Sequence, residues 1–318
     1  MNVELMIEHN GTLFQPAIPE GITWSTERKG CPSTLKFDVL KKATKAFDEG
    51  DPVRMTVDGK NVFYGFIFSK SRDKEGIISV TAYDQLRYLK NKDTYVYENK
   101  KAGDLIKMIA NDFHLQTGSI EDTGFNIVSR VEDNQTLFDI IQTALDLTLQ
   151  STSKMYVLYD DFGKLTLKSL ENMKVNILID EETGENFKYT SSIDENTYNK
   201  IKLTYENEET GKREVYIAQS GANINKWGVL QYFDTVSEGE NGKTKADALL
   251  KLYNSKTRKL SINDAFGSTD VRAGVLIPVL LNLGDTNVAN YMLVEKCTHT
   301  FKNDEHFMNL DLRGGEFV

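Results

Sequence analysis

The loop at residues 237–244 carries the residue types of a phosphate-binding turn. It reads Ser237-Glu238-Gly239-Glu240-Asn241-Gly242-Lys243-Thr244 and precedes a helical pattern, so it resembles the end of a P-loop. That motif requires a glycine where this chain has Ser237, and an acidic loop is a poor cradle for an anion. We therefore predict no nucleotide site here.

Four residues near the C-terminus resemble a metal site. His299 and His306 flank a turn that holds Asp304 and Glu305, and imidazole and carboxylate groups are common zinc ligands. The same spacing also arises when two histidines face each other across a hairpin. We expect the cross-strand pair and no metal ligands.

The acidic doublets are the remaining candidates for acid–base chemistry. They are Asp160-Asp161, Glu181-Glu182 and Glu208-Glu209, and all fall in predicted turns, where solvation explains them. A glycosidase would place its carboxylates on strands in an aromatic-lined cleft, whereas the 14 tyrosines and 16 phenylalanines are spread along this chain.

No other residue has the context of a nucleophile. The chain has no G-x-S-x-G elbow, and no serine or cysteine has a local sequence that predicts a base. Cys31 and Cys297 form no CxxC pair, and we expect two reduced, half-buried thiols, with a disulfide or a reactive thiol as alternatives. We predict a protein that is not an enzyme, with no catalytic, cofactor-binding or metal-binding residues and no cofactor.

A β-meander at residues 50–84 organises the rest of the chain. Two strands rich in β-formers flank the tight-turn signal Asp58-Gly59, and a charged turn leads into an alternating third strand. Residues 274–311 repeat this order. Tyr64 and Asp84 are 20 positions apart, as are Tyr291 and Asp311 (84 − 64 = 311 − 291 = 20). We interpret the two segments as a duplication, although any two meanders can look alike.

Between the meanders the pattern changes to helices. Residues 101–113 and 136–149 place apolar side chains at helical spacing, and strands at 155–159 and 164–168 provide a sheet for these helices to cover. Asp84 can cap a short preceding helix. Further strands are predicted at 200–205, 214–218 and 227–236, and a helix at 246–253.

The chain is thus predicted to be mainly β with an α+β insert. We place a first tube-like β-barrel domain at residues 1–90, an α+β middle domain with two amphipathic helices and a small sheet at 91–190, and a second tube-like β-barrel domain at 191–318. Trp24 is expected to be a core or rim aromatic.

The composition limits the classes of partner that we expect. The net charge is −9, and the 38 basic residues are scattered, which argues against specific nucleic-acid binding or an anionic-membrane surface. No stretch is apolar for the roughly 18 to 20 residues that a membrane span needs. The first residues also lack the pattern of a signal peptide.

Six segments together resemble a known family, the hub proteins of contractile-tail baseplates of the XkdQ/YqbQ type, which occur in PBSX-like prophages and tailocins and belong to the tail-tube-like (late control gene D) hub superfamily. They are ITWSTERKGCPSTLKF at 22–37, EGDPVRMTVDGKNVFYGFIFS at 49–69, TAYDQLRYLKNKDTY at 81–95, YNKIKL at 198–203, WGVLQY at 227–232 and FGSTDVRAG at 266–274.

The resemblance implies a structural virion or tailocin protein, assembled in the bacterial host cytoplasm. Such a hub is a homotrimer whose six barrels match the hexameric tail tube on one side and a trimeric central spike on the other. Implied partners are the tail tube protein, the spike protein, a LysM-containing baseplate protein, wedge proteins and the tape-measure protein. A carbohydrate- or receptor-binding tail component and a cell-wall hydrolase are the alternatives.

Overall fold

The computed structural model describes residues 1–41, 45–183, 186–207, 211–236, 241–284 and 287–314. One 12-stranded sheet and three small sheets account for the strands in these residues, and five helical segments of at least six residues accompany them. No helix in the described ranges is long and apolar enough to cross a membrane. The predicted class, mainly β with an α+β insert, is confirmed.

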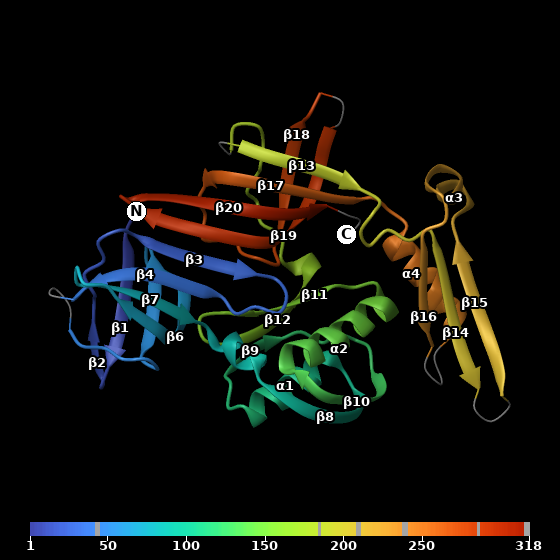
Figure 1. The fold of residues 1–318 in the computed structure, drawn as a ribbon, viewed down its shortest axis with the longest axis horizontal. Coiled ribbons are helices and arrows are strands. Elements are labelled where there is room, and N and C mark those ends of the chain that lie inside the picture. Colours follow the sequence, from blue (N-terminus) through green and yellow to red (C-terminus); the bar gives the residue numbers. More distant parts are fainter. Residues whose placement is uncertain (42–44, 184–185, 208–210, 237–240, 285–286, 315–318) are drawn as a thin grey trace.

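The first barrel is built from seven strands of the large sheet (Figure 1). They are β1 (Val3–His9), β2 (Thr12–Phe14), β3 (Ile22–Glu27), β4 (Thr34–Leu40), β5 (Pro52–Val57), β6 (Lys60–Arg72) and β7 (Ile77–Tyr83). Alternate side chains point inward, so on β4 the residues Leu35, Phe37 and Val39 are buried. Trp24 is also buried in this core, as expected.

The second barrel forms the other part of the same sheet. Its strands are β13 (Asn186–Ser192), β17 (Thr257–Phe266), β18 (Leu276–Asn282), β19 (Asn287–Lys302) and β20 (Glu305–Gly314). They pair in the order β13-β17-β20-β19-β18, which matches β3-β4-β7-β6-β5 of the first barrel, and every pairing is antiparallel. The two barrels therefore share a strand order as well as a sequence order.

The two meanders also agree in backbone detail. Gly50 has φ +93° and donates to the carbonyl of Ile67 (2.7 Å), whose own N–H donates to Asp51 (3.0 Å). Gly274 has φ +94° and donates to the carbonyl of Val294 (2.8 Å) in the same way. Only glycine adopts this conformation without strain. Two unrelated meanders would not need to share this glycine conformation and this hydrogen bond. The match therefore supports the duplication.

β-Bulges fix the residue correspondence. The register shifts between Ile67 and Ser69 on β6 and between Val294 and Lys296 on β19. Tyr64 and Tyr291 lie equally far before these bulges and are equivalent. The aspartates are not equivalent, because Asp84 follows β7 whereas Asp311 lies within β20 and pairs with Lys296. Their equal spacing in the sequence results from hairpins of different lengths.

The two glycines offer a matched test of this geometry. Gly50→Ala should lower the free energy of unfolding by about 1–2 kcal/mol, because a Cβ at positive φ is strained but would meet no atom within 4 Å. Gly274→Ala should cost more, because its Cβ would lie 2.4 Å from the Cγ1 atom of Val157. Denaturant midpoints measure both changes. Equal midpoints for the two variants would contradict the contact.

The middle unit packs two helices between small sheets. Its elements are the 3-10 helix η2 (Gln85–Lys90), β8 (Lys92–Lys100), α1 (Ala102–Asp112), β9 (Thr117–Ile120), β10 (Ile127–Thr136), α2 (Leu137–Thr152), β11 (Tyr156–Asp160), β12 (Leu165–Ser169) and η3 (Leu170–Asn172). Asp84 caps η2 by accepting from the N–H of Leu86 (3.0 Å), as predicted. The helices and the β11–β12 hairpin agree with the sequence patterns, whereas β8, β9 and β10 were not predicted.

A fourth unit is inserted between β13 and β17. It contains β14 (Lys200–Asn207), β15 (Lys212–Gln219), α3 (Gly221–Trp227), β16 (Gln231–Thr235) and α4 (Gly242–Tyr253), and it has its own core around Ile201, Leu203 and Leu249. The strand predicted at 227–236 is shorter than expected, because Gly228 ends α3 with φ +75°. In the first barrel the equivalent position is the short β3–β4 connection.

Sheets and cores suggest adjusted domain limits. Residues 174 and 179 already bridge to β18, and β13 joins the large sheet before residue 190. We propose the first barrel at 1–83, the middle unit at 84–173, the second barrel at 174–195 and 256–318, and the inserted unit at 196–255.

Candidate functional site

The two barrels meet where β3 pairs with the second half of β19. This antiparallel ladder runs from Ile22 opposite Phe301 to Glu27 opposite Lys296, beside β18 on the same edge of β19. It makes one continuous sheet of both barrels (Figure 1). The hydroxyl of Ser25 donates to that of Thr298 (3.1 Å) across this joint.

An aromatic stack seals the joint. The rings of Trp24 and His299 lie 4.7 Å apart and nearly parallel, and the indole N–H donates to the Ser33 hydroxyl (2.8 Å). His299 is fully buried, and its Nε2 lies 2.9 Å from the carbonyl of Val271. Burial, with a smaller effect of His306, lowers the pKa of His299 to about 3. The imidazole is therefore neutral at physiological pH.

The histidine pair forms as predicted. Nδ1 of His299 lies 2.8 Å from Nε2 of His306, and burial lowers the pKa of His306 to about 4. Since Nε2 of His299 can donate to Val271, its Nδ1 can accept from His306, which uses the lone pair that a metal would need. Within the described residues no group of three or more His, Cys, Asp or Glu could hold a metal ion.

A buried polar cluster joins three of the units. Arg272 comes from the second barrel, and its Nη1 donates to the carbonyl of Asp160 in the middle unit (2.9 Å), while its guanidinium lies 4.1 Å from the ring centroid of Tyr159. Asp84, the first residue of the middle unit, accepts from the N–H of Ser33 in the first barrel (3.1 Å). Burial raises the pKa of Asp84, and the nearby Asp160 raises it further.

Asp160 differs from the expectation of a solvated turn. It is 6% exposed and accepts from the N–H of Gly163 (2.7 Å) and from Nε2 of Gln85 (3.0 Å). Burial raises the pKa of its carboxyl. The turn forms from neighbouring residues, but Tyr64 of the first barrel packs against Phe162 within it and Arg272 of the second barrel bonds to Asp160, so the sequence pattern could not show the burial. Asp84 and Asp160 thus act as acceptors in a joint and do not line an open cleft.

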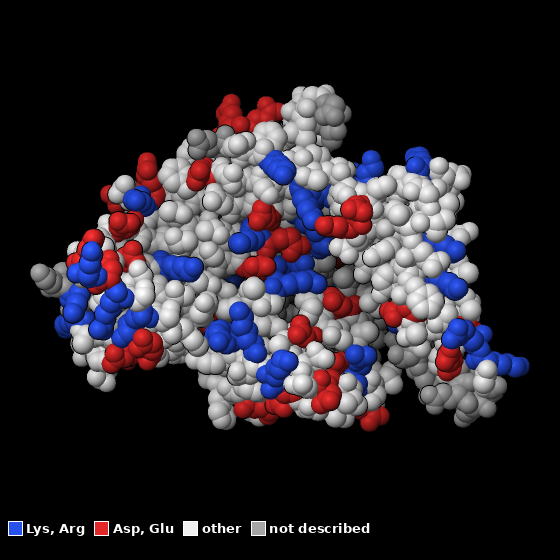
Figure 2. Space-filling model, in the orientation of Figure 1, with Lys and Arg blue, Asp and Glu red and all other residues white. Residues whose placement is uncertain are grey.

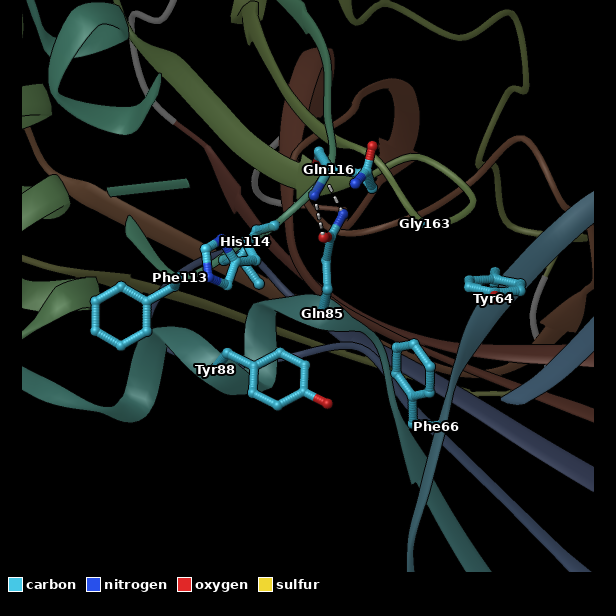
Figure 3. Close-up of a pocket in the computed structure, with 9 residues that line it drawn as sticks. Tyr64, Phe66, Gln85, Tyr88, Phe113, His114, Gln116 and Gly163 are labelled. Atoms are coloured by element: carbon cyan, nitrogen blue, oxygen red, sulfur yellow. Dashed lines mark hydrogen bonds between the residues drawn. The ribbon is translucent and has the colours of Figure 1, made fainter. Parts of the chain in front are cut away.

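A pocket of about 400 Å³ opens beside this cluster (Figure 3). It is lined by Tyr64, Phe66, Gln85, Tyr88, Phe113, His114, Leu115, Gln116 and Gly163. The side chain of Gln85 donates to the carbonyl of Gln116 and accepts from its N–H (3.0 Å), so this amide is already bonded. Four aromatic rings, those of Tyr64, Phe66, Tyr88 and Phe113, line the pocket, which suits an apolar side chain of a partner.

The other candidate residues do not meet. Cys31 and Cys297 are both free thiols, and Cys297 is buried, which raises its pKa. The first half of the loop at 237–244 lies outside the described residues, as does Glu208-Glu209. Figure 2 shows Lys and Arg interspersed with Asp and Glu on the face drawn.

Comparisons with known proteins agree on one family. The family described as YqbQ-like matches residues 22–313. The uncharacterized protein YqbQ of Bacillus subtilis is 32% identical over 304 residues, which cover 93% of this chain and 92% of that protein. The phage-like element PBSX protein XkdQ of the same organism is 32% identical over 305 residues, with the same coverage.

Solved structures share the fold at low identity. The 43 kDa tail protein of prophage MuSo2 from Shewanella oneidensis has a TM-score of 0.71 at 11% identity, covering 97% of this chain and 98% of that one. The tail protein from Neisseria meningitidis has a TM-score of 0.68 at 12% identity, covering 100% and 98%. The E. coli c3393 protein, a component of the type VI secretion system described as similar to the T4 tail proteins gp27 and gp5, has a TM-score of 0.57 at 11% identity, covering 99% and 78%.

Proposed function

The chain belongs to the YqbQ-like family, and on that premise we propose that it is a structural hub of a phage or tailocin tail baseplate. Its relative XkdQ is named as a protein of a phage-like element, and proteins of the same fold are named as tail proteins. The proposed task is to join the hexameric tail tube to a trimeric central spike in a contractile particle.

The observation that carries this proposal is the pair of matching barrels in one sheet. Each barrel has the strand order of the other, and β3 and β19 link them edge to edge. Three such chains would present six similar barrels in a ring. A closed ring of identical subunits needs head-to-tail contacts that close by rotation, which two complementary sheet edges on one chain can supply.

The proposed partners follow from this position. They are the tail tube protein, the central spike protein, wedge proteins, a LysM-containing baseplate protein and the tape-measure protein. The aromatic pocket at Tyr64 and Phe66 is the surface that we propose for an apolar anchor of one of them. We propose no catalytic role, because the buried Asp84 and Asp160 are used as structural acceptors. Carbohydrate binding is the alternative role for the pocket, which a glycan array would test.

We expect the purified chain to form a homotrimer. Mass photometry at micromolar protein should show a species of three times the 36.0 kDa chain mass. Cryo-electron microscopy of a purified tail should then place three copies in its baseplate. Six copies in the assembled particle would contradict the proposal, because the duplication would no longer account for the sixfold match.

A further inference from the structure

We infer that β13 of one chain pairs with the end of β6 of the neighbouring chain, through residues 189–192 and 69–72. The inference rests on the proposed trimeric ring and names the contact that would close it. It comes from the internal repeat. β3 pairs with β19 inside the chain, whereas the equivalent strands β13 and β6 do not pair with each other in the part of the chain that the structure describes.

The correspondence of strands identifies the two surfaces. β3 and β13 are the outer strands of the two barrels, and each pairs with the next strand, β4 or β17. β19 and β6 are also equivalent through their bulges. The partner of β13 should therefore lie on β6, as the partner of β3 lies on β19.

Ladder pairs give the register. Leu35 and Leu260 are equivalent, because their partners Ala82 and Leu312 lie opposite the equivalent residues Ile67 and Val294. Trp24 pairs with Leu35 and Tyr189 pairs with Leu260, so Trp24 corresponds to Tyr189. Arg72 follows the bulge on β6 at the same distance as His299 follows the bulge on β19, so these two residues are equivalent. By the same offsets, Ser25 and Thr298 correspond to Thr190 and Ser71.

Both edges are available. Within the part of the chain that the structure describes, β13 pairs only with β17, and residues 69–72 pair only with β7. β5 leaves β6 at Phe66, just as β18 leaves β19 at Leu293, where β3 then takes over the edge. An unpaired strand edge is a template for another strand.

The side chains at the equivalent positions are chemically matched. Ser25 and Thr298 are hydrogen-bonded across the internal joint, and Thr190 and Ser71 are again a hydroxyl pair, both exposed in the single chain. Where Trp24 stacks on His299, the new contact would bring the guanidinium of Arg72 to the ring of Tyr189, a favourable cation–π pair. The contact therefore has its own cross-strand complementarity.

Disulfide cross-linking tests the register. In a Cys31→Ser background, the double variant Ser71→Cys/Thr190→Cys should give bands of two and three chain masses on a non-reducing gel after mild oxidation with diamide, because directly opposed residues are within disulfide reach. Reduction should remove these bands. Ser25→Cys/Thr298→Cys is the matched positive control and should cross-link within one chain.

Register controls make the result specific. Each single variant, and the offset pair Ser71→Cys/Lys188→Cys, should give at least tenfold less cross-linked species. Trimers by mass photometry with no cross-link at 71–190 would overturn this inference and leave the proposed hub standing. A chain that stays monomeric and uncross-linked would overturn both.

Discussion

Replacing Arg272 with methionine is expected to lower the free energy of unfolding by about 3–5 kcal/mol. Arg272 is half-buried between the second barrel and the middle unit, with its Nε shielded from solvent, and its guanidinium donates to the Asp160 carbonyl and packs on Tyr159. Without it, the buried carboxyls of Asp84 and Asp160 lose the nearby positive charge. Chemical denaturation followed by tryptophan fluorescence would measure the loss.

Arg87→Met is the matched control, since Arg87 is half-buried at the molecular surface, has its guanidinium 5.3 Å from the centroid of Phe68 and takes no part in the polar cluster. A surface change of this kind should cost less than about 1 kcal/mol. Adding Asp84→Asn to Arg272→Met should recover part of the loss, because a neutral amide needs no counter-charge. If Arg272→Met unfolded at the wild-type midpoint, the polar cluster would not hold the units together.

Acid should weaken the joint between the barrels through His299. Its pKa in the folded chain is about 3, well below the usual value near 6.5, so the unfolded chain binds a proton that the folded chain excludes. This contribution is fully present above pH 6.5 and is lost as the pH falls toward 3. By pH 5 it should have cost about 2 kcal/mol.

The measurement is the free energy of unfolding at pH 7 and pH 5. His299→Gln should be less stable than wild type at pH 7 but should show a smaller further loss at pH 5, by about 2 kcal/mol. His114→Gln is the control, because His114 is exposed. An unchanged pH dependence in His299→Gln would show that another group causes the acid sensitivity. His306 would be the first to examine, since its pKa is also lowered.

Local patterns predicted the elements whose causes are local. The Asp58-Gly59 turn, the alternation on β7 and the apolar stripes of α1 and α2 each depend on neighbouring residues, and the structure has them. β8 and β10 were missed because their charged stretches lack a clear alternation. α3 was not predicted, and its end at Gly228 was missed because Trp227 and the aromatic residues after it resemble a continuous strand.

The candidate site was only partly predictable. The histidine pair follows from two residues on one hairpin, so its spacing was visible. The burial of Asp160 and the role of Arg272 were not visible, because both depend on contacts between distant segments: Gln85 lies 75 positions from Asp160, and Arg272 lies 112 positions from it. A charged residue beside a turn is ordinarily solvated, and only another unit packing over it reverses that expectation.

The sequence by itself determined the fold class, the family resemblance and the repeated meander, because these are written in turn residues and short-range periodicity. The tertiary structure decided which residues of the repeat are equivalent, since bulges and hydrogen bonds set the register and separated Tyr64 and Tyr291 from the misleading pair Asp84 and Asp311. It also decided that β3 closes the edge of β19 while, among the described residues, β13 and residues 69–72 of β6 each have a strand partner on one side only, because strand pairing between distant segments depends on which edges the folded barrels bring together.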